Sequence, residues 1–212
     1  MSQADDGPPT LGRAPGDVEL LDDTTIAEGF WRFRRLRLRH RLFDGTMGPA
    51  ITRERFQRAS ASVVLPYDAE RERVILIEQF RIGAVDDPIS PWLLEPVAGM
   101  VEPGEAPEDV ARREALEEAG CTIGQLVPCA AYYPSPGGLA EYLHCFIGSA
   151  VIADEGGVHG LDHEGENIRA HAVSTEVAWR WLDEGRVRTS PGIICLQYLK
   201  LHHAQLRARF TA

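Results

Sequence analysis

Alternation of apolar and polar residues predicts strands along the first part of the chain. The stretch RLRLRHRL, residues 35–42, alternates leucine with basic residues over most of its length, which is the period of a half-exposed strand. Two runs rich in β-branched residues, 60–68 and 73–80, are separated only by AERE and predict a hairpin. Further strands are expected at 92–99, 141–152 and 168–174.

Three further segments have helical patterns. Residues 110–120, VARREALEEAG, combine strong helix formers and end on a glycine. Ser174 is placed to cap a helix that ends at Gly185. A last helix is expected to begin at Ser190, with a proline at its second position, and to end near Phe210. Strands at the front, one helix among later strands and helices at the end predict an α+β fold.

Composition and charge exclude several classes of protein. The 212-residue chain has a formal net charge of −10, so it lacks the basic surface whose counterion release drives general nucleic-acid binding. No apolar run approaches membrane-spanning length, and the N-terminus has no basic-then-apolar secretory signal. The four cysteines form no CxxC pair, so we expect reduced thiols in a cytoplasmic protein. Residues 1–17, rich in proline, glycine and aspartate, are expected to form a flexible tail.

The segment from Gly99 to Cys121 carries the clearest chemical signal. Glu114, Glu117 and Glu118 project from one side of the predicted helix, because they are spaced at helical intervals. Two carboxylates about 5 Å apart repel by roughly 3 kcal/mol at an effective dielectric of 20, but by under about 1 kcal/mol in water. The cluster is therefore almost harmless on an open surface, whereas in a cleft it requires a cation. Ligands that are all oxygen favour Mg²⁺ or Mn²⁺, with Ca²⁺ less suited as a working ion.

The same helix carries a stripe of small residues next to its acidic side. Ala111, Ala115 and Ala119 recur at every fourth position. Small side chains allow a helix to lie close to a sheet, which would bring the acidic side to the edge of a pocket.

The segment resembles the Nudix box, GX5EX7REUXEEXGU, in which U is aliphatic. Every fixed position matches, and these positions are Gly99, Glu105, Arg113, Glu114, Glu117, Glu118 and Gly120. The two departures are Ala115 and Cys121, both small apolar residues at U positions. An acidic surface helix alone does not account for Gly99, Glu105 and Arg113 at these offsets. The resemblance implies a Nudix α/β/α sandwich.

Outside the box, the resemblance extends over roughly residues 25–210 to the ADP-ribose pyrophosphatase branch of that family. The matching stretches are 74–84, 92–100, 134–138, 159–171 and 196–203, and Pro136 lies about fifteen positions after the box. The resemblance implies an N-terminal β module at 18–58, used in dimerisation and substrate contacts, and a Nudix hydrolase domain at 59–212. It implies a homodimer that exchanges N-terminal strands. The expected reaction is Mg²⁺-dependent hydrolysis of ADP-ribose to AMP and ribose 5-phosphate, with Mn²⁺ as an alternative metal.

The resemblance also assigns the metal ligands. It implies that Glu114, Glu118 and the backbone carbonyl of Ala98 bind the metal directly. Glu117 is expected to share a metal or to hold a metal-bound water. Two alternatives stay open for Arg113: a part in the site, or an ion pair that holds the loop containing Glu105 to the helix.

A proton acceptor is expected outside the helix, because the helix carboxylates are occupied as ligands. The acidic, glycine-containing loop GLDHEGENIRAH begins at Gly160 and is suited to closing over a substrate. By position in the family pattern, Glu164 is the candidate base and Glu166 an additional metal ligand. Glu141 is the alternative base.

Substrate contacts are expected from several further segments. Arg53 and Arg81 match positions that contact phosphate or ribose in this branch. Phe30 and Trp31 are expected either to stack on adenine or to anchor a dimer strand. Ser135, Gly137 and Gly138 indicate a tight loop near the terminal ribose. The alternatives for function are hydrolysis of another nucleoside diphosphate sugar, such as GDP-mannose, and a non-catalytic sensor of ADP-ribose.

Overall fold

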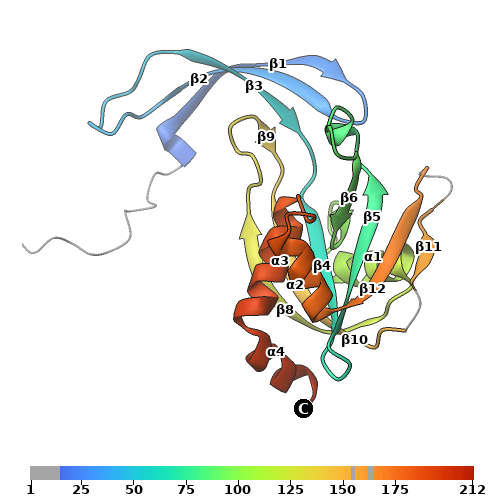
Figure 1. The fold of residues 1–212 in the computed structure, drawn as a ribbon. Coiled ribbons are helices and arrows are strands. Elements are labelled where there is room, and N and C mark those ends of the chain that lie inside the picture. Colours follow the sequence, from blue (N-terminus) through green and yellow to red (C-terminus); the bar gives the residue numbers. More distant parts are fainter. Residues whose placement is uncertain (1–14, 154–155, 162–164) are drawn as a thin grey trace, which may run out of the picture. The chain divides into compact units, whose positions relative to one another are not determined.

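The computed structural model describes residues 15–153, 156–161 and 165–212, which fall into two units (Figure 1). The first unit contains the described residues up to Arg58 together with Ser135–Ala140. The second contains Ala59–Pro134 and Glu141–Ala212. Residues 1–14 of the expected tail lie outside the described residues, and Pro15–Asp17 form a short 3-10 helix, η1.

The first unit is a four-stranded sheet. Its order is β1-β2-β3-β9, from β1 (Val18–Glu28), β2 (Arg32–His40), β3 (Ile51–Gln57) and β9 (Leu139–Ala140). The strand predicted from the alternation at 35–42 is confirmed in β2, where leucines are half-buried between more exposed arginines. No residue of β1, β2 or β3 is buried, so these strands enclose no hydrophobic core of their own.

Charged pairs connect neighbouring strands of this sheet. Arg34 on β2 lies 2.7 Å from Asp23 on β1, and Arg35 on β2 lies 2.9 Å from Glu54 on β3. Opposite charges facing each other across strands stabilise a sheet modestly. The basic face that the sequence presents is therefore partly neutralised within the unit.

The second unit is built around a mixed sheet with helices on both faces. Its strand order is β11-β12-β5-β4-β10-β8, with β6 paired to β5 and β7 paired to β4. The strands are β4 (Ala61–Asp68), β5 (Arg73–Phe80), β6 (Trp92–Glu95), β7 (Val97–Met100), β8 (Ile123–Tyr132), β10 (Leu143–Ala150), β11 (Gly157–His159) and β12 (Ile168–Ser174). The helices are η2 (Ile82–Ala84), α1 (Pro107–Ala119), α2 (Thr175–Asp183), α3 (Ser190–Leu201) and α4 (His203–Phe210).

Alternating side chains of the central strands fill two separate cores. On one face, Val64 and Ile77 belong to a core with the alanines of α1. On the other face, Leu65 and Leu76 belong to a core with α2, α3 and α4. The predicted α/β/α sandwich is therefore confirmed, and α1 has one face of the sheet to itself among the helices of the described chain. None of the described helices is long and apolar enough to span a membrane.

Local sequence signals identify several elements correctly. The runs at 60–68 and 73–80 form the antiparallel β4–β5 hairpin, and the strand predicted at 168–174 is β12. Ser174 caps α2, because its hydroxyl accepts a hydrogen bond from the backbone N–H of Val177 at 3.2 Å.

Two predicted elements are each divided in the structure. The single strand predicted at 92–99 is two strands, β6 and β7, separated at Pro96, which lacks the N–H that a sheet ladder uses. The single last helix is α3 and α4, separated at His202, whose φ of −110° and ψ of 17° are not helical. The side chain of the next residue, His203, lies 2.6 Å from the carboxylate of Glu72.

The close contact of α1 with the sheet gives a test of the alanine stripe. Ala115 is fully buried, so Ala115→Leu is expected to overpack this interface and lower the free energy of unfolding by about 1–3 kcal/mol. Chemical denaturation measures the change. Leu116→Ala, at a neighbouring position that is 58% exposed, serves as the control and is expected to stay within about 0.5 kcal/mol. Equal effects at the two positions would contradict the packing.

Candidate functional site

Helix α1 is fixed at both ends by local sequence signals. It begins with Pro107, whose carbonyl accepts a hydrogen bond from the Ser62 hydroxyl at 2.6 Å. Gly120 ends the helix with a positive φ of 59°, and its N–H donates to the carbonyls of Ala115 and Leu116. The glycine at the last fixed position of the box is therefore a helix terminator, as the sequence predicts.

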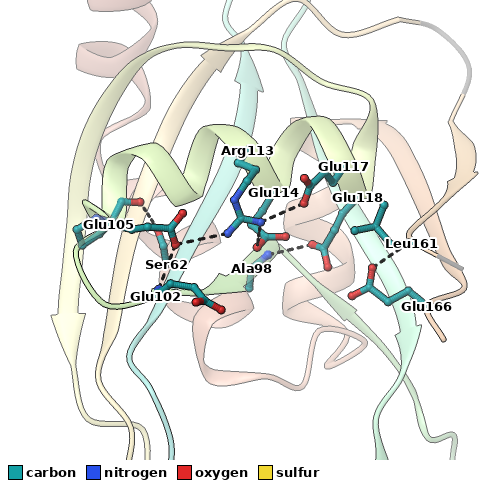
Figure 2. Close-up of polar contacts among 11 residues, drawn as sticks. Ser62, Ala98, Glu102, Glu105, Arg113, Glu114, Glu117, Glu118, Leu161 and Glu166 are labelled. Carbon is teal, nitrogen blue, oxygen red and sulfur yellow. Dashed lines mark hydrogen bonds and ion pairs between the residues drawn. The ribbon is translucent and has the colours of Figure 1, made fainter. Parts of the chain in front are cut away.

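The acidic side of α1 faces the strand β7 (Figure 2). Glu118 is only 3% exposed, and its carboxylate accepts a hydrogen bond from the backbone N–H of Ala98 at 3.1 Å. Glu114 and Glu117 are half-buried on the same side. The sequence thus places three carboxylates together, and the structure buries one of them almost completely.

Gly99 makes room for Glu114. Gly99 pairs with Ser62 in the β7–β4 ladder, next to the Ala98–Val63 pair. A methyl group at position 99 would overlap the carboxyl group of Glu114. The absence of a side chain at this position therefore allows the Glu114 carboxylate to lie against the strand.

Arg113 lies among the carboxylates of the box. Its Nη1 donates to Glu114 at 2.8 Å and to Glu117 at 3.1 Å, and its Nη2 lies 3.8 Å from Glu105 (Figure 2). Glu105 in turn accepts a hydrogen bond from the backbone N–H of Glu102 at 3.1 Å. These contacts connect the loop before α1 to the acidic side of the helix.

Burial makes the acidic cluster hard to ionise. The pKa of Glu118 is raised to about 8, chiefly by desolvation. The charges of Glu114 and Glu166 act in the same direction, and the Ala98 N–H and Arg81 act against it. Desolvation also raises the pKa of Glu114, despite the nearby Arg113. A cation that bound here would relieve the desolvation and the repulsion together.

Only part of the acidic loop can be placed in this site. Glu166 is half-buried, accepts a hydrogen bond from the backbone N–H of Leu161 at 3.1 Å, and acts electrostatically on Glu114 and Glu118. The candidate base Glu164 lies outside the described residues. The alternative base, Glu141, is 7% exposed and lies two residues before β10 in the second unit.

Arg81 belongs to the second unit and has a partner that the sequence did not reveal. Its Nε lies 2.7 Å from the carboxylate of Glu95 on β6. An acidic residue within the apolar strand WLLE is a signal that was available in the sequence. The carboxylate of Glu95 joins two segments fourteen residues apart, so no local spacing predicts the pair.

The other predicted substrate residues belong to the first unit. Phe30 is exposed, with its ring 5.9 Å from that of Trp31, and Arg53 donates to the carbonyl of Thr52 at 2.8 Å. Ser135, Gly137 and Gly138 lie in a turn in which the Ser135 carbonyl accepts from the N–H groups of Gly138 and Leu139. All of these contacts lie within the first unit.

The donor set of the second unit is suited to a hard divalent cation. The carboxyl groups of Glu114, Glu118 and Glu166 lie close enough to act electrostatically on one another on one side of the sheet, and hard divalent cations prefer such oxygen ligands. Among the described residues, however, no three acidic, histidine or cysteine side chains are already spaced to hold a metal ion. Arg113 contacts Glu114 and also Glu117, so metal binding by Glu114 requires these side chains to rearrange.

Comparison with known proteins gives a family and named relatives. The model of the NUDIX domain matches residues 56–191. The ADP-ribose pyrophosphatase of Escherichia coli (strain K12) is 45% identical over 207 residues, covering 98% of this chain and 98% of that protein. The GDP-mannose pyrophosphatase of Cronobacter sakazakii is 32% identical over 189 residues, covering 87% of this chain and 96% of that protein.

A solved structure also has a similar fold. It is described as an ADP compounds hydrolase and aligns with a TM-score of 0.66 over 92% of this chain and 100% of that chain. The sequences are 16% identical, so this likeness concerns the fold alone.

The burial of Glu118 predicts an unusual pH dependence of stability. Its pKa is about 8 in the folded protein against an ordinary value of 4.5, so the folded state binds more protons than the unfolded state between these limits. The stability that this proton on Glu118 gives to the folded state is complete below about pH 4.5 and is lost as the pH rises to about 8. In chelator-containing buffer, Glu118→Gln is expected to be more stable than the parent at the upper end of this window, by on the order of a few kcal/mol.

Denaturant titrations across this window measure the effect. Glu108→Gln, an exposed position in the first turn of the same helix, is the matched control and should keep the parent's pH dependence. A Glu118→Gln variant whose stability follows the same pH curve as the parent would contradict a buried, protonated Glu118.

Proposed function

The chain belongs to the Nudix family, and from this premise we propose that it hydrolyses the pyrophosphate of ADP-ribose to AMP and ribose 5-phosphate. The observation that carries the proposal is the buried carboxylate of Glu118 between the Ala98 backbone and the charges of Glu114 and Glu166. Such a cluster favours the binding of a divalent cation. A divalent cation stabilises the negative charge of a pyrophosphate during hydrolysis. The full-length similarity to a named ADP-ribose pyrophosphatase supports this choice of substrate.

Mg²⁺ is the proposed metal, and Mn²⁺ is expected to replace it. When bound, the cation neutralises pyrophosphate oxygens and makes a coordinated water easier to deprotonate. Glu114, Glu118 and the Ala98 carbonyl are the proposed ligands, with Glu166 as an additional ligand and Glu117 beside them. The backbone geometry supports Ala98: its N–H points to Glu118, and in an antiparallel strand the carbonyl of the same residue points to the same edge.

Glu164 is the proposed general base, and Glu141 is the alternative. The carboxylates of α1 are assigned to the metal, so the proton acceptor has to come from another segment. Glu166 lies within the reach of the α1 charges, and Glu164 is two residues away from it along the chain. That spacing supports the assignment of Glu164.

Arg81 and Arg53 are proposed to bind the phosphates or ribose, with Phe30 and Trp31 against the adenine and the turn of Ser135, Gly137 and Gly138 near the terminal ribose. Arg81 is the best supported of these, because its charge acts on Glu118. A guanidinium group matches the geometry of phosphate oxygens.

The first unit is proposed to form a homodimer with a second copy of the chain. Every residue of the edge strand β1 is exposed, including the apolar residues Val18, Leu20 and Ile26. Exposed apolar residues on an edge strand favour pairing with another chain. A cytoplasmic location is proposed with it, because all four cysteines are free thiols.

A substrate panel tests the proposed activity. With Mg²⁺, the purified protein is expected to release AMP from ADP-ribose with a kcat/KM well above that for GDP-mannose and other nucleoside diphosphate sugars. Products are identified by chromatography after reaction in ¹⁸O-labelled water. A preference for GDP-mannose would replace the proposed substrate, because the box contacts the pyrophosphate and metal and does not select the base.

A variant of the metal site separates an enzyme from a sensor. Glu118→Gln is expected to abolish AMP release while ADP-ribose binding and folding persist, and Glu108→Gln on the same helix is expected to remain active. Binding of ADP-ribose without turnover in the parent protein would favour the sensor.

Paired substitutions identify the general base. Glu164→Gln is expected to lower kcat by roughly 10²–10⁴-fold with a modest change in KM, because only proton transfer is lost. Glu141→Gln is expected to have the smaller effect. The role passes to Glu141 if its variant has the greater loss in kcat.

A further inference from the structure

Arg81 continues the buried face of strand β5 beyond the end of the strand. Ile77 faces the core beneath α1, together with Ala111 and Ala115. Side chains alternate along an extended chain, so Gln79 and Arg81 follow Ile77 on that face. Arg81 lies just beyond β5 but keeps an extended backbone, with φ of −124° and ψ of 114°. The Arg81 side chain therefore lies on the face that carries the acidic side of α1.

Glu95 reaches the same face from the neighbouring strand. It stands opposite Ile77 in the antiparallel β5–β6 ladder, and residues directly opposite share a face. The Glu95 side chain is only 10% exposed, whereas that of Arg81 is 38% exposed. The carboxylate is thus held inside the protein, and the guanidinium extends from it towards the open side.

The contact between the two side chains uses only one edge of the guanidinium. Glu95 approaches Nε at 2.7 Å, and within the described part of the chain neither terminal nitrogen of Arg81 has a hydrogen-bond partner. The two terminal nitrogens form a planar pair suited to two oxygens of one phosphate. A charged group held at Nε thereby leaves the phosphate-binding edge available.

The backbone of Arg81 is fixed independently of its side chain. Its N–H donates to the Pro91 carbonyl at 2.9 Å, and its carbonyl accepts from the N–H of Ala84 at 2.9 Å. Only the side-chain torsions of Arg81 are then free to vary. A long arginine side chain loses considerable conformational entropy when it is ordered. The contact with Glu95 removes that freedom before a ligand arrives.

We propose that Glu95 is a positioning residue that holds Arg81 in the orientation in which its terminal nitrogens bind the diphosphate of the substrate. The inference rests on the proposed function, because it assigns the ligand of Arg81 as a diphosphate. It adds a residue outside the box to the machinery that binds the substrate. A purely structural ion pair would have the same geometry but would act on folding and not through Arg81.

A double-mutant cycle separates these two roles. Glu95→Gln is expected to lower kcat/KM by roughly 10- to 100-fold, mainly by raising KM, with the substrate that the parent hydrolyses best in the panel. In an Arg81→Ala background, the same substitution is expected to have no further effect, because the side chain it positions is gone. Equal losses in both backgrounds, or no loss in the parent, would overturn the proposal.

Glu78→Gln is the matched control. Glu78 lies on β5 and is paired with His171 at 2.9 Å, but it follows Ile77 directly and so points to the opposite face. This variant is expected to keep the parent's kcat and KM. A loss equal to that of Glu95→Gln would also overturn the proposal, since it would assign the effect to the strand as a whole.

A measurement without substrate tests the geometry alone. In ¹H–¹⁵N spectra, the Nε–H of Arg81 is expected to exchange slowly with water in the parent and rapidly in Glu95→Gln. Rapid exchange in the parent would overturn the proposed orientation. Failure of the proposed function gives a different result: the parent hydrolyses no diphosphate compound, while the Nε–H of Arg81 remains protected.

Discussion

The burial of one carboxylate is the constraint on which the rest of the structure depends. Glu118 is nearly inaccessible, and its neighbours include other glutamates as well as a single backbone N–H donor. The protein can place it there only because α1 lies very close to the sheet, which the buried Ala111 and Ala115 permit. Gly99 has the matching role on the strand, since any side chain there would displace Glu114. Small residues around the acidic cluster therefore make room for its carboxylates between the helix and the sheet.

The two strands on either side of Pro96 carry the two parts of the proposed reaction site. On one side of the proline, β6 pairs with β5 and holds Glu95 beside Arg81. On the other side, β7 pairs with β4 and directs the Ala98 backbone at Glu118. One short segment thereby serves the proposed phosphate contact and the proposed metal site. The distance between them is set by covalent geometry and sheet pairing, both of which are rigid.

The sequence predicts what depends on local spacing. The helix of the box, its terminal Gly120 and the alanine stripe are all recognisable, because helical periodicity determines which side chains share a face. The Arg81–Glu95 pair was missed, since it depends on the register between two strands. The break at His202 was also missed; it lies next to a contact between His203 and Glu72, which are distant in the chain. The roles assigned to Glu164, Glu141 and the residues of the first unit remain predictions.

The buried carboxylate of Glu118 is proposed to bind a divalent cation, and the release of protons when that cation binds is the sharpest test of this role. Because its pKa is about 8, Glu118 is largely protonated near neutral pH and must lose that proton when Mg²⁺ binds. Calorimetric titration with Mg²⁺ in buffers of different ionisation enthalpy counts the protons released. We expect about one proton to be released for each Mg²⁺ bound by the parent, and none by Glu118→Gln. Tight Mg²⁺ binding by the parent without proton release would contradict the proposed role of Glu118.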